Sequence, residues 1–353
     1  MQVKIIDPSN DKRWDTFVLE HKFGSIYHHS SWKEVIERTY SHATPLYFIL
    51  EDNKGRIKAG IPFFLIKSWL TGTRLVSLPF TYLCDVLADT WEDVNRLLEA
   101  VIDEKEKFRA SYVEIRTQRS YDLFNNSKTI KRFYYKTFIL TLNNEPEILR
   151  KSFHKTSVQQ RINKAKRENT IVRAGKTEED MRIFYNLHIL TRKKHGLPPQ
   201  PYKFFHNLWR IMHPRGLFNF LLAEHDSKVI AGAILLKFKD TVYYQESVSD
   251  SRFLKKYSPN HFLIWKAIEM ACNEGFKYFD FGRTSPKDRG LIDFKRRWGT
   301  EEHEIPYLYF PAIKGITSIE EESIKYRLVT TMGRKMPLSL AKIWGGFLYK
   351  HWG

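Results

Sequence analysis

Two stretches of this chain, Ile49-Leu-Glu-Asp-Asn-Lys-Gly-Arg-Ile-Lys-Ala-Gly60 and Leu221-Leu-Ala-Glu-His-Asp-Ser-Lys-Val-Ile-Ala-Gly232, align without a gap at an offset of 172 residues. Each passes from an apolar run through a polar turn into a second apolar run, a pattern that predicts a β-hairpin. The offset is close to half of the 353-residue chain. The repeat therefore predicts two copies of one α/β domain.

The segments that follow the two hairpins also correspond. They are a helix expected at 91–108 and a strand at 112–116 in the first half, and a helix at 258–273 and a strand at 277–281 in the second. Alternating strands and amphipathic helices indicate mixed sheets flanked by helices. We expect an N-terminal domain at 1–148, a C-terminal domain at 149–315 and a basic tail at 316–353.

The composition describes a globular protein with a strongly positive charge. Lys and Arg number 58 against 40 Asp and Glu, a net charge of +18, and 42% of residues are hydrophobic. Such a charge favours polyanionic partners, namely nucleic acid, anionic lipid or phosphorylated substrates. Cys84 and Cys272 stand in apolar segments, so buried thiols in a reducing compartment are expected. No uncharged run exceeds the 12 residues of 39–50, which predicts a cytoplasmic protein, soluble or peripheral at the membrane.

The stretch 279–299 concentrates cations and glycine after a predicted strand. Six cations stand within 15 residues: Arg283, Lys287, Arg289, Lys295, Arg296 and Arg297. This density suits an anionic ligand or a developing oxyanion. Gly282, Gly290 and Gly299 would permit tight turns and close approach of the backbone to a ligand. A solvated basic loop is the alternative interpretation.

A second basic segment, 150–167, leads into the C-terminal half. Val158, Ile162 and Ala165 give it a narrow apolar stripe. A helix docked by that stripe would present its cations to phosphates, such as those of a tRNA. These cations are Arg161, Lys164, Lys166 and Arg167. A solvated helix face is again the alternative.

The C-terminal stretch 323–353 contains six cations and no Asp or Glu. Apolar and aromatic residues, among them Leu340, Ile343, Phe347 and Trp352, stand between the cations. The pattern predicts either a tail that binds an anionic membrane surface or a helix that packs back on the domain.

Several kinds of site have no support. The chain has no Cys-x-x-Cys, His-Glu-x-x-His, Walker-type loop, Gly-x-Gly-x-x-Gly or Gly-x-Ser-x-Gly motif. No metal site and no bound cofactor are therefore expected. His188 and His261 stand on helices among apolar residues and are expected to be packing or capping residues.

Five pieces of sequence carry a family resemblance. They are Tyr27-His-His-Ser-Ser-Trp32, Leu75-Val-Ser-Leu-Pro-Phe80, Arg161-Ile-Asn-Lys-Ala-Lys166, Thr191-Arg-Lys-Lys-His-Gly-Leu-Pro198 with Phe204-Phe205, and Phe279-Asp-Phe-Gly-Arg283 with Phe294-Lys295 and Trp298-Gly299. In this order, over about residues 20–310, the chain resembles the Fem-type aminoacyltransferases, including Fem-like proteins of exopolysaccharide and surface-protein systems. The resemblance implies two tandem GNAT-like domains. It also implies transfer of an amino acid from aminoacyl-tRNA to an amine of a lipid- or nucleotide-linked cell-envelope precursor such as that of peptidoglycan.

The resemblance implies a catalytic role for Lys295. It matches the lysine near the transferring carbonyl, where a fixed cation stabilises the tetrahedral oxyanion. Phe294 and Trp298 flank it and are expected to fix its backbone beside the substrate. Asp280 is a candidate base for the attacking amine, and Arg283 is expected to bind anionic substrate.

Three further residues fall where the family gathers donor-binding and substrate-positioning groups: Arg192, Tyr202 and Tyr244. One position departs from the family pattern. Members that act on peptidoglycan precursors often carry a lysine where this chain has Ile36, and the nearest lysine here is Lys33. This departure puts a peptidoglycan substrate in question.

Two other functions stay open at the level of sequence. An acetyl-CoA-dependent GNAT holds pyrophosphate on a glycine-rich loop before a helix, whereas the corresponding loop here, Arg252–Asn260, contains no glycine and so disfavours CoA. A basic nucleic-acid-binding protein without catalytic activity is the third possibility.

Overall fold

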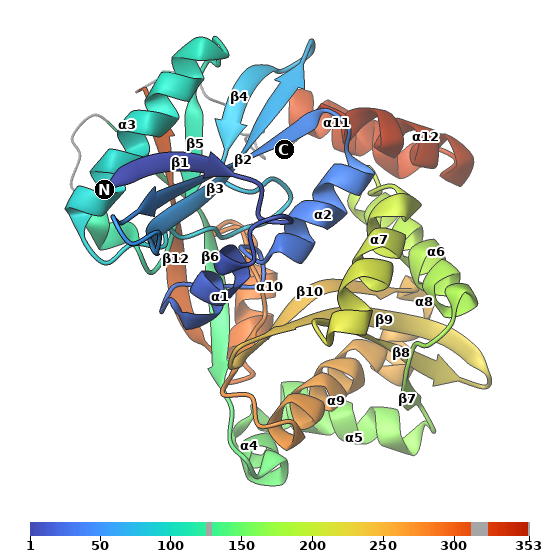
Figure 1. Cartoon of the computed structure of the whole chain (residues 1–353). Helices are drawn as coiled ribbons and strands as arrows, with labels where there is room; N and C mark the ends of the chain where they lie inside the picture. The colour runs from blue at the N-terminus through green and yellow to red at the C-terminus, as the bar shows by residue number, and fades with distance from the viewer. Residues whose placement is uncertain (125–128, 312–323, 352–353) are drawn as a thin grey trace. The chain divides into compact units, whose positions relative to one another are not determined.

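The chain divides into two compact units in a computed structural model that describes residues 1–124, 129–311 and 324–351 (Figure 1). The first unit holds Met1–Lys136 together with the described parts of Glu304–Thr317 and Phe347–Gly353. The second holds Thr137–His303 and the described part of Ser318–Gly346. Segments of the chain beyond residue 303 thus return to the first unit, which the predicted linear boundary after residue 148 did not anticipate. The predicted boundary at 315/316 lies outside the described residues.

The first unit is built on a mixed sheet. The strand order is β1 (Gln2–Ile6), β2 (Ala43–Glu51), β3 (Ile57–Ser68), β4 (Gly72–Val76), β5 (Val113–Arg116) and β12 (Glu301–Phe310). Helix α3 (Trp91–Lys107) packs on one face through Val94, Leu97 and Val101, and α1 (Arg13–Glu20) and α2 (Ser30–Thr39) also pack on the sheet. A short 3₁₀ turn, Tyr121–Leu123, follows β5.

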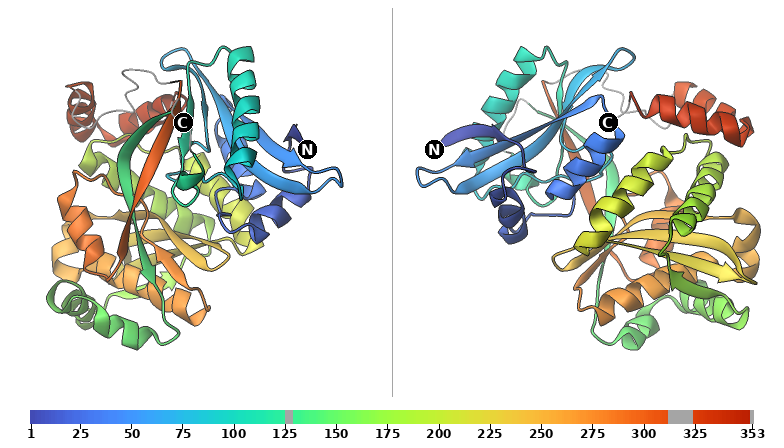
Figure 2. Two further views of the ribbon diagram at one scale, coloured as in Figure 1. Left: turned by 90° about the vertical axis from the view of Figure 1, so that its left-hand side faces the viewer. Right: turned by 45° about the vertical axis from the view of Figure 1, so that its right-hand side comes forward.

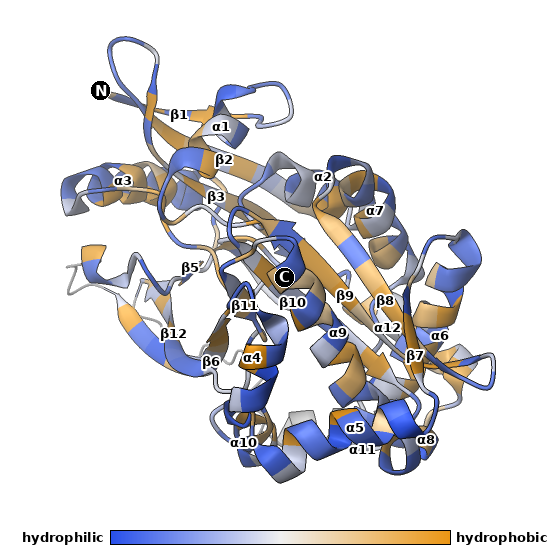
Figure 3. Ribbon diagram, turned by 90° about the horizontal axis from the view of Figure 1, so that it is seen from below, coloured by the Kyte–Doolittle hydropathy of each residue, from blue (hydrophilic) through white to orange (hydrophobic). Residues whose placement is uncertain are grey.

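The second unit repeats this plan. Its strands follow the order β6 (Ile130–Thr141), β11 (Tyr278–Asp280), β10 (Thr241–Ser249), β9 (Lys228–Phe238), β8 (Phe218–His225) and β7 (Ile171–Ala174). Strand β6 begins in the first unit and enters the second at Thr137. The β10–β11 pair is parallel and its neighbours are antiparallel. In Figure 3, β3 of the first unit and β9 of the second are coloured as hydrophobic along most of their length, because both are central and buried.

Two groups of helices cover the second sheet (Figure 2). The first group packs on one face through the core around Trp265 and Ile162: α4 (Pro146–Ser152), the π-helical turn Lys155–Gln159, α5 (Gln160–Arg167) and α9 (Pro259–Asn273). The second group packs through Phe184 and Phe205: α6 (Glu178–His195) and α7 (Tyr202–Met212), followed by a 3₁₀ turn, His213–Arg215. The remaining helices are α8 (Ser251–Tyr257), α10 (Arg289–Arg296), α11 (Ile324–Lys335) and α12 (Leu338–Leu348).

The structure confirms the predicted hairpin repeat. β2 pairs with β3, with Ile49 opposite Gly60, and β8 pairs with β9, with Leu222 opposite Gly232. Each hairpin shifts register close to its turn, at Leu50/Glu51 and Ala223/Glu224. The fold is therefore of the predicted α/β class, with a repeated plan of mixed sheets flanked by helices.

Local sequence signals define both ends of helix α6. Thr177 accepts a hydrogen bond from the Asp180 N–H, and the Asp180 carboxylate accepts one from the Thr177 N–H, so both halves of a capping box are present at the start of α6. Gly196 ends the helix in the left-handed region at φ 71°. Because non-glycine residues rarely adopt that conformation, glycine is the natural stop signal here.

Two predicted loops are helical. Most of the glycine-free segment Arg252–Asn260 lies in α8 and the first turn of α9, because Asp250 caps α8 by accepting from the Arg252 N–H. The stretch after Asp288 forms α10, so Gly290 lies in a helix rather than in a turn. Gly282 and Gly299 do adopt the positive φ expected of turn residues, at 71° and 75°.

Candidate functional site

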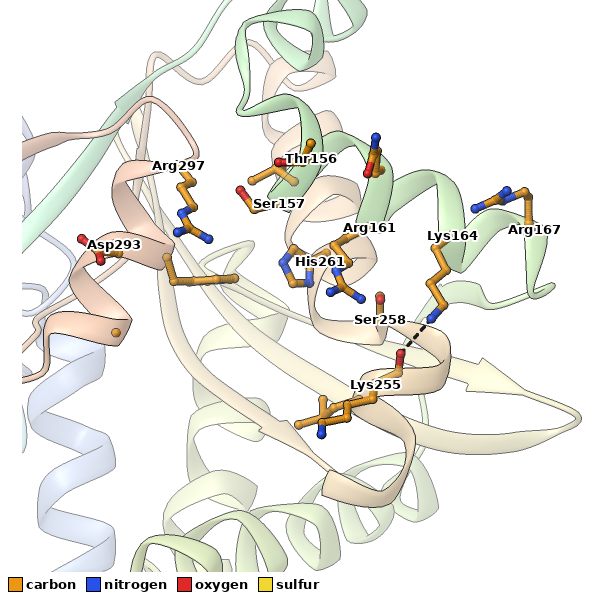
Figure 4. Close-up of a pocket in the computed structure, with 15 residues that line it drawn as sticks. Thr156, Ser157, Arg161, Lys164, Arg167, Lys255, Ser258, His261, Asp293 and Arg297 are labelled. Carbon is orange, nitrogen blue, oxygen red and sulfur yellow. Dashed lines mark hydrogen bonds between the residues drawn. The ribbon is translucent and has the colours of Figure 1, made fainter.

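A pocket of about 880 Å³ opens in the second unit where three helical segments meet (Figure 4). The π-helical turn and α5 form one wall, the α8–α9 junction forms the second, and α10 forms the third. The lining residues are Thr156, Ser157, Val158, Gln160, Arg161, Lys164, Arg167, Leu254, Lys255, Ser258, His261, Gly290, Asp293, Phe294 and Arg297.

The pocket is strongly cationic. Its lining has a single carboxylate, that of Asp293, against five cations: Arg161, Lys164, Arg167, Lys255 and Arg297. Across the described parts of the chain, none of these five cations forms an ion pair, and the Lys164 ammonium donates to the Lys255 carbonyl oxygen at 2.9 Å. Unpaired cations on three converging walls, together with nearby Ser and Thr hydroxyls, suit phosphate oxygens.

The local sequence explains how α5 presents its cations. The His154 ring accepts from the Ser157 N–H and so caps the first turn, while Val158, Ile162 and Ala165 are buried in the core. The predicted apolar stripe is therefore the buried face. Cations at intervals of three along the chain then line the pocket: Arg161, Lys164 and Arg167. Lys166 is exposed and lies outside the pocket lining.

Aromatic rings form another part of the lining. The His261 ring lies 5.3 Å from the Phe294 ring and 6.2 Å from the Trp298 ring, centroid to centroid, and in Figure 4 it lies between Arg297 and Arg161. Burial, together with the nearby Arg161 guanidinium, lowers the pKa of His261 to about 4. His261 is therefore neutral at neutral pH. The sequence assigned it to packing, and only its place on the first turn of α9 could have indicated a pocket residue.

Lys295 does not line this pocket. Its side chain is 5% exposed, and its ammonium donates to the carbonyl oxygens of Phe281 at 2.8 Å, Gly282 at 2.7 Å and Arg283 at 3.3 Å. Burial lowers the pKa of Lys295 to about 7, although the Asp280 carboxylate favours the charged form. All three ammonium protons are thus directed at the loop that follows β11.

Asp280 holds the same loop from the other side. Its Oδ1 accepts from the Thr137 hydroxyl at 2.7 Å and from the Gly282 N–H at 2.7 Å, and the residue is buried. Trp298 is fully buried and packs on Phe281 and Phe153. Arg283 is exposed at the end of the loop. The structure therefore brings Lys295, Asp280 and the loop together in one small cluster.

The remaining predicted residues lie elsewhere in the second unit. Arg192 and Tyr202 stand on α6 and α7; Arg192 donates to the Pro198 carbonyl at 3.0 Å, and the Tyr202 hydroxyl donates to Glu178. Tyr244 packs on Phe279, and burial raises its pKa to about 12. These three side chains lie outside the pocket lining.

A hydrogen bond between His188 of α6 and Glu246 of β10 was not indicated by the sequence. His188 Nδ1 lies 3.1 Å from Glu246 Oε1, and its Nε2 accepts from the Gln200 N–H at 3.2 Å. The second contact puts the ring proton on Nδ1, so the imidazole donates to the carboxylate. Burial lowers the pKa of His188, and the Glu246 carboxylate offsets part of that shift. His188 is thus a satisfied core residue, as expected.

In the first unit, a buried side chain occupies the position where Fem-type enzymes that act on peptidoglycan precursors often carry a lysine. Ile36 is fully buried, and Lys33 is 4% exposed and pairs with Glu37 at 2.6 Å and Asp7 at 2.9 Å. Both free thiols, those of Cys84 and Cys272, are buried as predicted.

Comparison with known proteins indicates which kind of domain holds this pocket. Residues 152–296, which include every residue of the pocket lining except Arg297, match a family model described as an acetyltransferase (GNAT) domain. The chain carries a GNAT acyltransferase domain. No curated protein matches the chain.

Solved structures extend the likeness over both units. A structure of FemX covers 87% of this chain and 97% of its own, with a TM-score of 0.71 and 16% identity. L-PGS from Bacillus licheniformis covers 92% and 96%, with a TM-score of 0.57 and 10% identity. A tandem GNAT protein from the clavulanic acid biosynthesis pathway covers 89% and 99%, with a TM-score of 0.59 and 8% identity. The chain thus has the Fem-like tandem GNAT fold that its motifs indicated.

Proposed function

We propose that this acyltransferase moves an aminoacyl group from aminoacyl-tRNA to an amine on a lipid- or nucleotide-linked cell-envelope precursor. The single observation that carries the proposal is the cationic pocket, with five cations against one carboxylate. The 3′ end of a tRNA brings phosphates and unstacked bases together. Cations bind such phosphates, and rings such as Phe294 and His261 stack on bases.

The chemistry requires an amine to attack the ester carbonyl of the aminoacyl group. A C–N bond forms, the ester C–O bond breaks, and the proton lost by the amine ends on the departing ribose hydroxyl. Charge develops on the carbonyl oxygen in the tetrahedral intermediate, and a fixed cation nearby lowers the barrier. Lys295 supplies a cation at the end of β11, and Asp280 supplies the carboxylate that accepts the amine proton.

The contacts of Lys295 define how it acts. Two of its three hydrogen bonds are short, and the bond to the Arg283 carbonyl is the longest at 3.3 Å. We assign that third proton to the oxyanion, because releasing the weakest contact costs least. The other two bonds keep the loop of Phe281 and Gly282 in place. Arg283, exposed beside this loop, binds anionic substrate.

Acetyl-CoA is the second candidate donor. Its phosphates also suit a cationic pocket. The start of α9 argues against acetyl-CoA, because Ser258 and Pro259 occupy the place of a glycine-rich loop. Proline has no N–H to offer, and side chains limit the approach of pyrophosphate to the backbone. We therefore favour the tRNA ester.

The proposed acceptor rests on the tandem fold that the chain shares with FemX and L-PGS. A precursor that is linked to a nucleotide or lipid is made at the inner face of the membrane, and we place this protein there. This chain has the buried Ile36 where enzymes that act on peptidoglycan precursors often carry a lysine. The test below therefore uses a mixture of envelope precursors rather than a peptidoglycan precursor alone.

The test compares donors directly. Bulk tRNA charged with ¹⁴C-labelled amino acids is incubated with the purified protein and an extract of nucleotide- and lipid-linked envelope precursors. We expect label in the precursors that survives mild alkali, since an amide is stable where the tRNA ester is not. Label arriving from ¹⁴C-acetyl-CoA instead would assign an ordinary GNAT reaction. Binding of tRNA without transfer from either donor would leave only a nucleic-acid-binding function.

A further inference from the structure

The C-terminal helices pack through their smallest residues. A Cβ on Gly333 of α11 would lie 2.4 Å from the Gly196 carbonyl oxygen, and one on Gly345 of α12 would lie 2.1 Å from that of Pro199. Ala341, one turn before Gly345, is 4% exposed. Close approach of small residues therefore docks this segment in the second unit.

Three large apolar residues of α12 face solvent, whereas Trp344 and Leu348 are half-buried. Ile343 is 71% exposed, Leu340 is 52% exposed and Phe347 is 45% exposed. Their spacing of three and four residues places them in one stripe along the helix. In a helix that served only to pack, the large side chains would be buried and the small ones exposed. Here the small residues are buried and three large ones are exposed. Packing on the domain, one of the two predictions for the tail, therefore explains only the buried face of α12.

An exposed tryptophan adds to this surface within the first unit. Trp69, at the turn after β3, is 79% exposed, and its ring centroid lies 6.5 Å from that of Phe347. Tryptophan at an exposed turn is typical of groups that sit at the headgroup level of a bilayer.

The charges around the stripe are all of one sign. Arg334, Lys335, Lys342 and Lys350 are exposed, and the sequence from 323 to 353 contains no Asp or Glu. A second copy of the chain seated on this face would bring these cations together and be repelled. An anionic lipid surface attracts each of them, at about fivefold in partition per Lys or Arg near the headgroups.

We propose that the exposed stripe Leu340, Ile343 and Phe347 of α12, with its flanking cations, docks the protein on an anionic membrane surface. The helix lies in the interface rather than across it. Within the described residues, no helix has both the length and the apolarity needed to cross a bilayer. The inference is independent of the acyl transfer, because it concerns where the protein binds and not what it transfers.

The test is flotation of the full chain with phosphatidylglycerol-containing vesicles and with neutral phosphatidylcholine vesicles. The test variant is Leu340→Glu/Ile343→Glu. The control, Leu19→Glu/Ile148→Glu, makes the same change of charge at two exposed helical positions elsewhere, 54% and 50% exposed. All four sites are exposed, so the variants should fold, and circular dichroism checks this.

We expect the wild-type protein and the control to bind the anionic vesicles and neither to bind the neutral ones. The α12 variant should lose about tenfold or more in partition relative to the control, since two apolar anchors are replaced by anions. Equal binding by the α12 variant and the control would overturn the proposal. So would failure of the wild-type protein to bind anionic vesicles, or a wild-type dimer that the α12 variant alone dissociates.

Discussion

Replacing Lys295 by methionine tests the buried ammonium and its three carbonyl contacts. The side chain is 5% exposed and donates to Phe281, Gly282 and Arg283. Loss of a buried hydrogen bond costs about 1–3 kcal/mol, so the two short bonds together are worth about 2–6 kcal/mol. Methionine keeps most of the volume and the packing on Phe138, which lies 5.3 Å from the ammonium.

The charge on Lys295 acts in the opposite direction at neutral pH. Its pKa falls from 10.5 to about 7 on folding because the amine is buried. At about 1.4 kcal/mol for each pKa unit, that difference corresponds to a cost of about 5 kcal/mol near pH 7. The gain from removing this cost offsets the lost hydrogen bonds. We therefore expect Lys295→Met to change the free energy of unfolding by no more than about 2 kcal/mol at pH 7.

The difference between wild type and variant should grow as the pH rises. Between pH 7 and about 10.4 the unfolded lysine holds a proton that the folded lysine has released. The unfolded state then binds more protons, so wild-type stability rises with pH by at most about 1.4 kcal/mol per pH unit. At pH 9.5 the variant should be less stable than the wild type by about 3 kcal/mol more than at pH 7.

Urea unfolding of both proteins at the two pH values measures this difference. Lys266→Met, which removes a half-buried lysine of α9 without touching the loop carbonyls, is the control whose pH dependence is subtracted. An equal loss of stability at both pH values would refute the reasoning about the buried amine. Under the proposed mechanism, aminoacyl transfer by Lys295→Met should also fall by about a hundredfold.

Three other substitutions test separate parts of the structure. Asp180→Asn should lower the free energy of unfolding by about 2 kcal/mol at pH 7, because it weakens the capping box of α6. The Arg173 guanidinium holds the pKa of the Asp180 carboxyl well below its usual range. The loss of stability should therefore shrink as the pH falls below about 4. Gly345→Val places a branched side chain against the Pro199 carbonyl and should release α12, which limited proteolysis would detect as faster cleavage after residue 330. Arg283→Ala should weaken substrate affinity with little change in turnover, and a fall in turnover alone would contradict an anion-binding role.

The sequence predicted those parts of the fold that local rules determine. The two hairpins and the apolar stripe of α5 each depend on residues close in sequence, and the structure confirms them. The return of β12 to the first unit depends on pairing with distant β5, which no local pattern reports. The helix α8 was missed because its cap, Asp250, lies just before the segment that was read as a loop.

The candidate site was likewise predicted only where nearby residues determine it. The sequence identified cations on α5 and after β11 as a likely anion site by density alone, and the structure puts Arg161, Lys164 and Arg297 around one pocket. The family resemblance placed Lys295 at the same site. Its amine instead donates to the carbonyl oxygens of Phe281 and Gly282, and Lys295 does not line the pocket. The direction of a helical side chain depends on which face of the helix packs, and spacing along the sequence does not report that face.

The most direct test of the central claim is the salt dependence of tRNA binding by two charge-matched variants. Arg161→Gln/Lys164→Gln removes two cations that line the pocket, and Lys151→Gln/Lys166→Gln removes two exposed cations of the same region that do not. If the pocket holds tRNA phosphates, the first variant should bind more weakly. Its plot of log affinity against log salt should be shallower by about 1.4, whereas the second should keep the wild-type slope. Equal slopes for the two variants would contradict the assignment of this pocket to the donor.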